Sequence, residues 1–150
     1  MTTAQFIYQT YNTIGTKERR CSSVFTDMQG VVYSYGYHYP LAFAIGGLNF
    51  INVAGYSSST AKHIAWAKNA IGYDNYIGVK LSQRATSFLR DNSQMDSNKL
   101  LTLLSLLEVE RDEIELQMAS KNRKDTSVFA WLEHQFDELS INIKLVKQAI

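Results

Sequence analysis

The sequence predicts a single α+β domain, in which a small antiparallel sheet of about three strands and a following helix precede a long C-terminal antiparallel helical hairpin. Three observations lead to this class. The 150 residues are the usual size of one domain, and a single proline leaves no linker-like segment. Glycine, aromatic and β-branched residues concentrate in residues 1–80, which we expect to hold the sheet. Leucine, glutamate and lysine concentrate in residues 95–150, which we expect to be helical.

The first half consists of short segments broken by turns. Apolar residues at helical spacing predict a helix over residues 4–13, and the polar segment 16–20 predicts a loop. The expected strands are residues 22–26, 31–39 and 48–53, with a weaker one at 77–81. A glycine-containing turn at residues 27–30 joins the first two. Pro40 ends the second strand because proline cannot donate a ladder hydrogen bond, and residues 42–47 form a short helix or a bend.

One helix is expected between the third strand and the weaker fourth one. The serine cluster offers an N-cap at Ser57 or Ser58, and apolar residues at helical spacing follow over residues 59–71. Gly72 stands where a helix commonly ends in a left-handed residue. Residues 85–90 are expected to form a single helical turn.

The last third of the chain predicts two long helices. The first begins at Asp96 or Ser97 and ends near Lys121, and a polar turn separates it from a second helix that Thr126 or Ser127 caps. This hairpin carries more apolar surface than a three-stranded sheet covers, so we expect a homodimer or higher oligomer. The expected interface residues are Leu100, Leu103, Leu104, Leu107, Phe129, Leu132, Phe136 and Leu139.

Charge and composition exclude some classes of function. The net charge of +1 argues against a strongly basic nucleic-acid coat and against an acidic mimic of DNA. Residues 1–72 nevertheless hold five basic and two acidic side chains, which indicates an anionic partner. The lone Cys21 allows no internal disulfide and fits a reducing cytoplasm. We expect neither a signal peptide nor a membrane partner, because no basic segment precedes an apolar run and no apolar run could span a bilayer.

The stretch VVYSYGYHYP places tyrosines at alternate positions, Tyr33, Tyr35, Tyr37 and Tyr39. On a continuous strand all four share one face, and His38 lies on the other. Such a face can stack nucleobases. It can equally cover a helix or a subunit contact, with the hydroxyl groups reaching water.

A second group of candidate residues surrounds the serine cluster. His63 falls one turn into the expected helix, and His38 ends the strand before it, so the two rings can meet if the chain folds back. Ser57, Thr60 and Lys62 at the helix start can bind an anion, although ordinary N-capping explains the serines equally well. The three histidines and one cysteine do not form a zinc-ligand pattern, so we expect no metal and no cofactor.

These two segments together resemble a recurring pattern in small uncharacterised proteins of phages and mobile elements. In that pattern a strand YSYGxHxPxA precedes an asparagine-containing strand and a YSxxTxxH helix start. The matching residues are Tyr33, Ser34, Tyr35, Gly36, His38, Pro40, Ala42, Asn52, Tyr56, Ser57, Thr60 and His63. The match covers about residues 24–71 and implies a phage or mobile-element origin and the host cytoplasm, without implying a reaction.

Three hypotheses for function follow. The first is a non-enzymatic accessory protein that binds a host protein or protein–nucleic-acid complex, such as an inhibitor of a host defence system of the anti-CRISPR or anti-restriction type. The second is nucleotide or nucleic-acid binding through the front half. The residues expected around that ligand are Tyr33, Tyr35, His38, Ser57, Thr60, Lys62 and His63. The third is a hydrolase that uses His38 and His63 for acid–base chemistry.

Overall fold

The computed structural model describes residues 1–15, 17–55, 57–81, 86–90, 94–120 and 126–150. Its helices are α1 (Thr3–Thr10), α2 (Ser58–Ile71), α3 (Ser97–Ser120) and α4 (Thr126–Ala149), with a 3₁₀ turn η2 (Ser87–Leu89). Its strands are β1 (Arg19–Cys21), β2 (Val24–Thr26), β3 (Val32–Ser34), β4 (Pro40–Ile45), β5 (Leu48–Asn52) and β6 (Ile77–Val79). The described part of the chain therefore forms an α+β fold with one mixed sheet.

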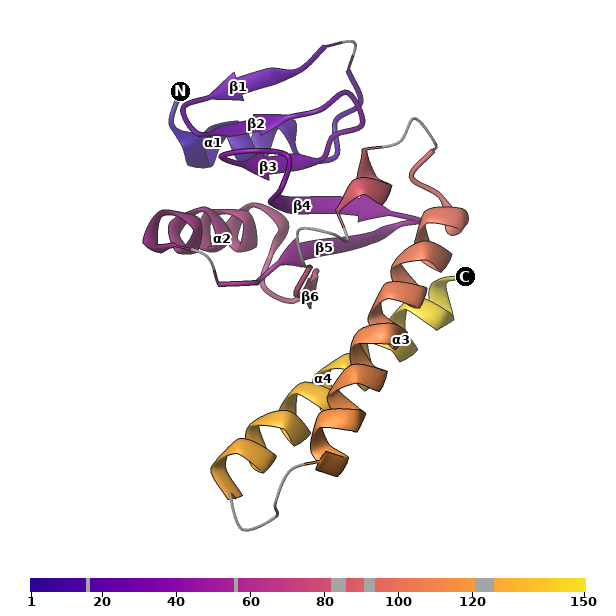
Figure 1. Cartoon of the computed structure of the whole chain (residues 1–150). Coiled ribbons are helices and arrows are strands. Elements are labelled where there is room, and N and C mark those ends of the chain that lie inside the picture. The colour runs from indigo at the N-terminus through magenta and orange to yellow at the C-terminus, as the bar shows by residue number, and fades with distance from the viewer. Residues whose placement is uncertain (16, 56, 82–85, 91–93, 121–125) are drawn as a thin grey trace.

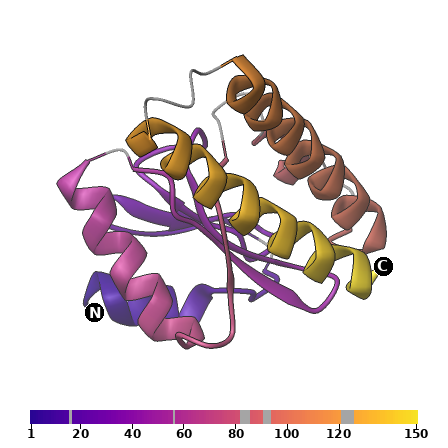
Figure 2. The ribbon, with the colours of Figure 1, turned by 90° about the horizontal axis from the view of Figure 1, so that it is seen from below.

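The six strands lie in the sheet in chain order. Strands β1 to β5 form an antiparallel meander, and β6 pairs with β5 in parallel. Helix α2 makes the crossover that a parallel pair requires. Helices α1 and α2 cover one face of the sheet, and the α3–α4 hairpin covers the other (Figures 1 and 2).

The larger sheet corrects the predicted three-stranded one. Residues 40–45 form the central strand β4, where a short helix or a bend was expected. Its sequence PLAFAI lacks the polar–apolar alternation that marks a half-exposed strand, because both of its faces are buried. Pro40 begins this strand, which is a position that tolerates proline, so the prediction that it ends one was wrong. Strand β1 occupies part of the predicted loop at 16–20.

The tyrosine strand is also shorter than predicted. It ends at Ser34, where Tyr35 takes a φ of +66° and the chain turns back. The turn is closed by a hydrogen bond from Ser34 N to Tyr39 O of 3.0 Å. The tyrosines therefore do not share one face. Tyr33 and Tyr37 pack toward the α3–α4 hairpin, Tyr39 packs toward α1 and α2, and Tyr35 remains half-exposed.

The helices agree more closely with the sequence. The predicted helix 59–71 is α2, and the Ser57 hydroxyl caps it by accepting from Thr60 N at 3.1 Å. The two long C-terminal helices are α3 and α4, and the turn predicted at 121–125 lies outside the described residues. The first helix ends at Thr10, three residues earlier than predicted. Among the described helices, none is long and apolar enough to cross a membrane.

Each face of the sheet has its own apolar core. The core under α1 and α2 contains Phe6, Ile7, Val32, Leu41, Ile51 and Ala67. The larger core under the hairpin contains Tyr33, Phe43, Phe50, Leu100, Leu103, Leu107, Leu139, Ile143 and Val146. The two cores together bury the sheet on both faces, so the fold has three layers.

The hairpin residues assigned to an oligomer interface lie mostly inside this chain. Leu100, Leu103, Leu107, Leu132 and Leu139 are buried. The other three of that set, Leu104, Phe129 and Phe136, are partly buried. Six strands cover more apolar surface than the three predicted, so the buried leucines need no second subunit. An oligomer stays a prediction, and it would have to use other side chains.

Two leucines on α3 provide a matched test of this intramolecular core. Leu103 is fully buried, whereas Leu101, two residues away, is 47% exposed. We expect Leu103→Ala to lower the free energy of unfolding by about 2–5 kcal/mol, because it leaves a cavity between α3 and the sheet. Leu101→Ala should change it by about 0.5 kcal/mol or less, as surface substitutions usually do. Urea unfolding measures both, and equal losses would contradict the assigned packing.

Candidate functional site

Polar and aromatic side chains meet at one end of the strands, next to the start of α2. Because neighbouring strands of the meander run in opposite directions, this edge combines the end of β3 with the start of β2. We call it the histidine edge and define it by Ser23, Ser34, Tyr35, His63 and Trp66. The first three come from the ends of sheet strands, and the last two from α2.

His63 is the centre of this edge. Together with Thr60 and Ala67 it forms the buried stripe of α2, at the spacing of residues that share one helix face. Its Nδ1 lies 2.6 Å from Ser34 Oγ, and its Nε2 lies 3.5 Å from Ser23 Oγ. Burial lowers the pKa of His63 and favours the neutral ring. A neutral imidazole has one donor and one acceptor nitrogen, which suits a position between two hydroxyl groups.

Three aromatic rings form a row beside these serines. The Tyr35 ring centroid lies 5.5 Å from that of His63, which lies 5.6 Å from that of Trp66. Tyr35 is 49% exposed. Its φ of +66° is rare for a bulky side chain, and its N–H donates to Ser23 O at 2.7 Å. The backbone of the β3–β4 turn therefore holds the Tyr35 ring at the surface.

The residues predicted to bind a ligand are only partly brought together. Tyr35 and His63 are in contact. Ser57 and Thr60 lie at the start of α2 in the geometry of an N-cap. Tyr33 is fully buried, and its hydroxyl donates to Asp27 Oδ2 at 3.2 Å, so it does not belong to a surface platform.

The two remaining predicted residues lie at the margin of the histidine edge. Lys62 is exposed on α2, directly before His63. His38 lies in the β3–β4 turn, where a Cβ added to Gly36 would come within 2.7 Å of its Nδ1. Both ring nitrogens of His63 are within hydrogen-bond distance of serine hydroxyls. The structure thus describes His63 as a histidine between two serines.

Sequence reasoning missed some polar groups of this region. Ser34 belongs to the recurring motif, but only the fold shows that it meets a residue 29 positions away. Asn52, at the end of β5, is fully buried, and its Oδ1 accepts from Ala54 N and Leu81 N at 3.2 Å each. Within the described part of the chain, its Nδ2 has no partner. This end of the sheet therefore carries buried polar groups that an apolar core alone would not require.

The arrangement permits two kinds of chemistry. The exposed Tyr35 ring can stack on a flat ligand. The neutral His63 can accept a proton from a neighbouring hydroxyl group. Among the described residues no group of three or more His, Cys, Asp or Glu side chains could hold a metal ion.

Comparisons with known proteins give no relative of this chain. No family model matches it, and neither the curated proteins nor the solved structures contain a match.

The buried His63 should make stability depend on pH. Because its pKa in the folded protein is below the usual 6.5, the unfolded chain binds the proton more readily. The free energy of unfolding is therefore highest above about pH 6.5. It decreases as the pH falls below that value, because the unfolded chain then takes up a proton that the buried ring does not. We expect the free energy of unfolding to fall more steeply from pH 7.5 to 5 in the native protein than in His63→Gln.

The matched control is His134→Gln, because His134 is 67% exposed on α4. Urea unfolding at each pH measures the slopes. The His134 variant should stay closer to the native slope than the His63 variant, because its exposed contact with Glu138 contributes little to stability. An unchanged slope in His63→Gln would contradict a buried neutral His63.

Proposed function

We propose that the protein is a binding protein of a phage or mobile element that takes up a nucleotide or single-stranded nucleic acid on the histidine edge. The observation that carries this proposal is Tyr35. Its backbone has a φ of +66°, and its ring is 49% exposed beside the ring of His63.

The unusual backbone of Tyr35 supports a functional role. A non-glycine residue in this region costs on the order of 1 kcal/mol, and such residues cluster at functional sites. Here the strained conformation exposes an aromatic ring. Its burial would have been the more stable outcome for a structural side chain. Stacking on an exposed ring stabilises a bound base by about 1–3 kcal/mol, whichever of the bases it is.

The surroundings of the row favour an anionic ligand. Lys62 is exposed on α2 and lies one helical turn before Trp66, so both reach the same side of the helix. Residues 1–72 carry three more basic than acidic side chains. Phosphate groups next to a stacked base would meet this positive charge.

Binding to a host protein, the first hypothesis from the sequence, predicts a large exposed or oligomeric apolar surface. Three hairpin leucines that could supply it, Leu100, Leu103 and Leu107, cover the sheet instead. The hypothesis stays open for the outer face of the hairpin, where Leu116 and Trp131 are 71% and 60% exposed.

Tyr35→Gly separates the role of the ring from the stability of the fold. Glycine adopts a positive φ at no steric cost, so the variant should fold as stably as the native protein. We expect it to bind a fluorescent oligothymidylate about 5- to 150-fold more weakly, which corresponds to one lost stacking contact of about 1–3 kcal/mol. Affinity of the native protein should fall as salt is added. Fluorescence anisotropy measures both effects.

Two further variants serve as controls. Tyr35→Phe keeps the ring and should keep the affinity. Tyr73→Ala removes a ring that is 63% exposed after the end of α2, away from the histidine edge, and should also bind normally. The proposal fails if the native protein binds neither oligonucleotides nor mononucleotides, or if Tyr35→Gly binds as tightly as the native protein.

A hydrolase is the second candidate function. Ser23 Oγ lies 3.5 Å from His63 Nε2, and Ser34 Oγ lies 2.6 Å from Nδ1. In this arrangement Ser34 accepts from Nδ1–H and fixes the tautomer, which leaves Nε2 to take the proton of Ser23 as its oxygen attacks a carbonyl carbon. Ser22, directly before Ser23, has a φ of +57°, so the candidate nucleophile follows a strained turn residue.

A fluorophosphonate probe tests this second function directly. We expect one adduct on the native protein and none on Ser23→Ala. Mass spectrometry of the intact protein and of its peptides locates the adduct. Ser22→Ala is the matched control, because it removes the neighbouring hydroxyl group and should still be labelled. Absence of any adduct on the native protein would reject Ser23 as a nucleophile and leave the binding proposal unaffected.

A further inference from the structure

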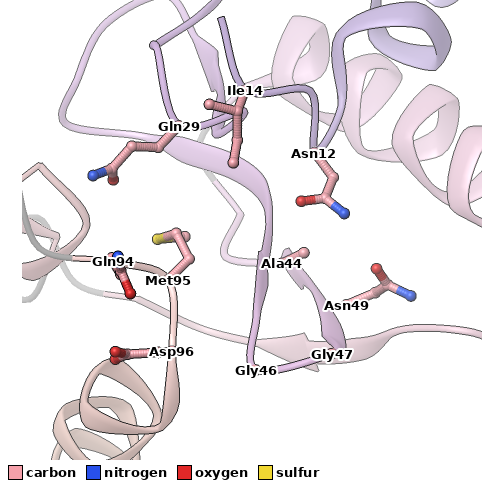
Figure 3. A pocket seen from close by; sticks show the side chains of 10 residues that line it. All are labelled: Asn12, Ile14, Gln29, Ala44, Gly46, Gly47, Asn49, Gln94, Met95 and Asp96. Atoms are coloured by element: carbon pink, nitrogen blue, oxygen red, sulfur yellow. The ribbon is translucent and has the colours of Figure 1, made fainter.

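A cavity lies at the end of the strands that is opposite to His63. The turns β2–β3 and β4–β5 meet there, together with the loop after α1 and the segment that leads into α3 (Figure 3). Its volume is about 540 Å³. This is within the range of small-molecule sites, about 300–1,000 Å³.

Backbone hydrogen bonds hold the walls of this cavity together. Asn12 N donates to Gly30 O at 2.9 Å and joins the loop after α1 to the β2–β3 turn. Gly46 N donates to Met95 O at 3.1 Å and joins the β4–β5 turn to the segment before α3. A Cβ at Gly30 would come within 2.8 Å of the Asn12 backbone, so the first contact requires glycine. The cavity is therefore formed before any ligand arrives.

The lining combines amide groups with a small apolar surface. Figure 3 shows Gln29, Gln94 and Asp96 along one side and Asn12 along the other, with Ile14 and Met95 between them. The lining residues include no cation. A buried lysine, Lys99, donates to Gln29 Oε1 at 3.4 Å and orients that amide. The Asp96 carboxylate accepts from Asn98 N at 3.0 Å, which fixes its position at the start of α3.

Ile14 is the least expected part of this lining. It is 82% exposed, although it is a large aliphatic residue in a loop that two hydrogen bonds tie to the β2–β3 turn. Covering its side chain would stabilise the molecule through the removal of apolar surface from water. Met95, which lies below Ile14 in Figure 3, adds a thioether to the lining of the cavity. Thioethers make favourable contacts with aromatic rings.

We propose that this cavity binds an uncharged planar heterocycle with adjacent hydrogen-bond donors and acceptors, the chemistry of an unpaired nucleobase. The flat ring lies between Ile14 and Met95. Its edge meets side-chain amides, which pair with base edges in a bidentate way. The Asp96 carboxylate, the charged group among the lining side chains, disfavours a phosphate or carboxylate inside the cavity. The cavity is separate from the histidine edge, so this inference does not rest on the proposed function.

Methyl NMR of the four methionines tests the proposal on the intact chain. Met95 lines the cavity, whereas Met118 lies on α3 beyond it. Guanosine, adenosine, cytidine and uridine are the probes, added separately up to about 10 mM to detect weak binding. We expect at least one to move the Met95 methyl signal upfield, as stacking on a ring does, with Met118 unchanged. Ribose and glucose, which lack a flat ring, should not produce this shift.

Ala44→Leu provides the matched variant. Ala44 lines the cavity from β4 but belongs to neither apolar core, so leucine fills the cavity without disturbing them. It should abolish the Met95 shift and preserve the melting temperature. Tyr35→Gly should keep the shift, which separates failure here from failure of the proposed function.

A short oligonucleotide distinguishes the two sources of the base. A Met95 shift with nucleosides assigns the cavity to a free base or nucleoside. A shift with the oligonucleotide alone assigns it to an unpaired base of a strand. No Met95 shift with any of these probes, or an equal shift in Ala44→Leu, overturns the proposal.

Discussion

The rest of the structure depends on covering both faces of β4. This strand is central in the sheet and almost entirely apolar, with Leu41 on the side of α1 and α2 and with Phe43 and Ile45 on the side of the hairpin. A sheet with two apolar faces needs a helical layer on each. Helix α1, which precedes the sheet, and helix α2, which connects β5 to β6, form one layer. Helices α3 and α4, which follow β6, form the other. The long hairpin is therefore part of the core.

The same requirement positions the candidate site. Helix α2 must cross the sheet to bring β6 beside β5, and this crossing carries His63 to the end of β3. The 2.6 Å contact between His63 and Ser34 links the helix layer to the sheet at the point where the strand becomes a turn. Tyr35, the next residue, has the unusual backbone. The candidate site thus lies around one polar contact at the end of an apolar core.

The sequence predicted the helices better than the sheet, for physical reasons. Helix ends depend on local chemistry, and Ser57 and Gly72 mark those of α2. Burial of β4 on both faces removes the alternation by which a strand is recognised. The sequence named Tyr35 and His63 as candidate residues, but it did not reveal their partners. Ser23 lies 40 residues from His63, and a tyrosine with positive φ has no sequence signature.

The position of the hairpin in the chain has a consequence for synthesis on the ribosome. Strands β1 to β5 pair with near neighbours and can form while the chain is still growing. Most of the cover for the face that carries Phe43 and Phe50 comes from α3 and α4, which are synthesised after these strands. Until then the nascent sheet presents an apolar surface to its surroundings. The interval before the hairpin emerges is the time at which this face is most exposed to aggregation and to chaperones.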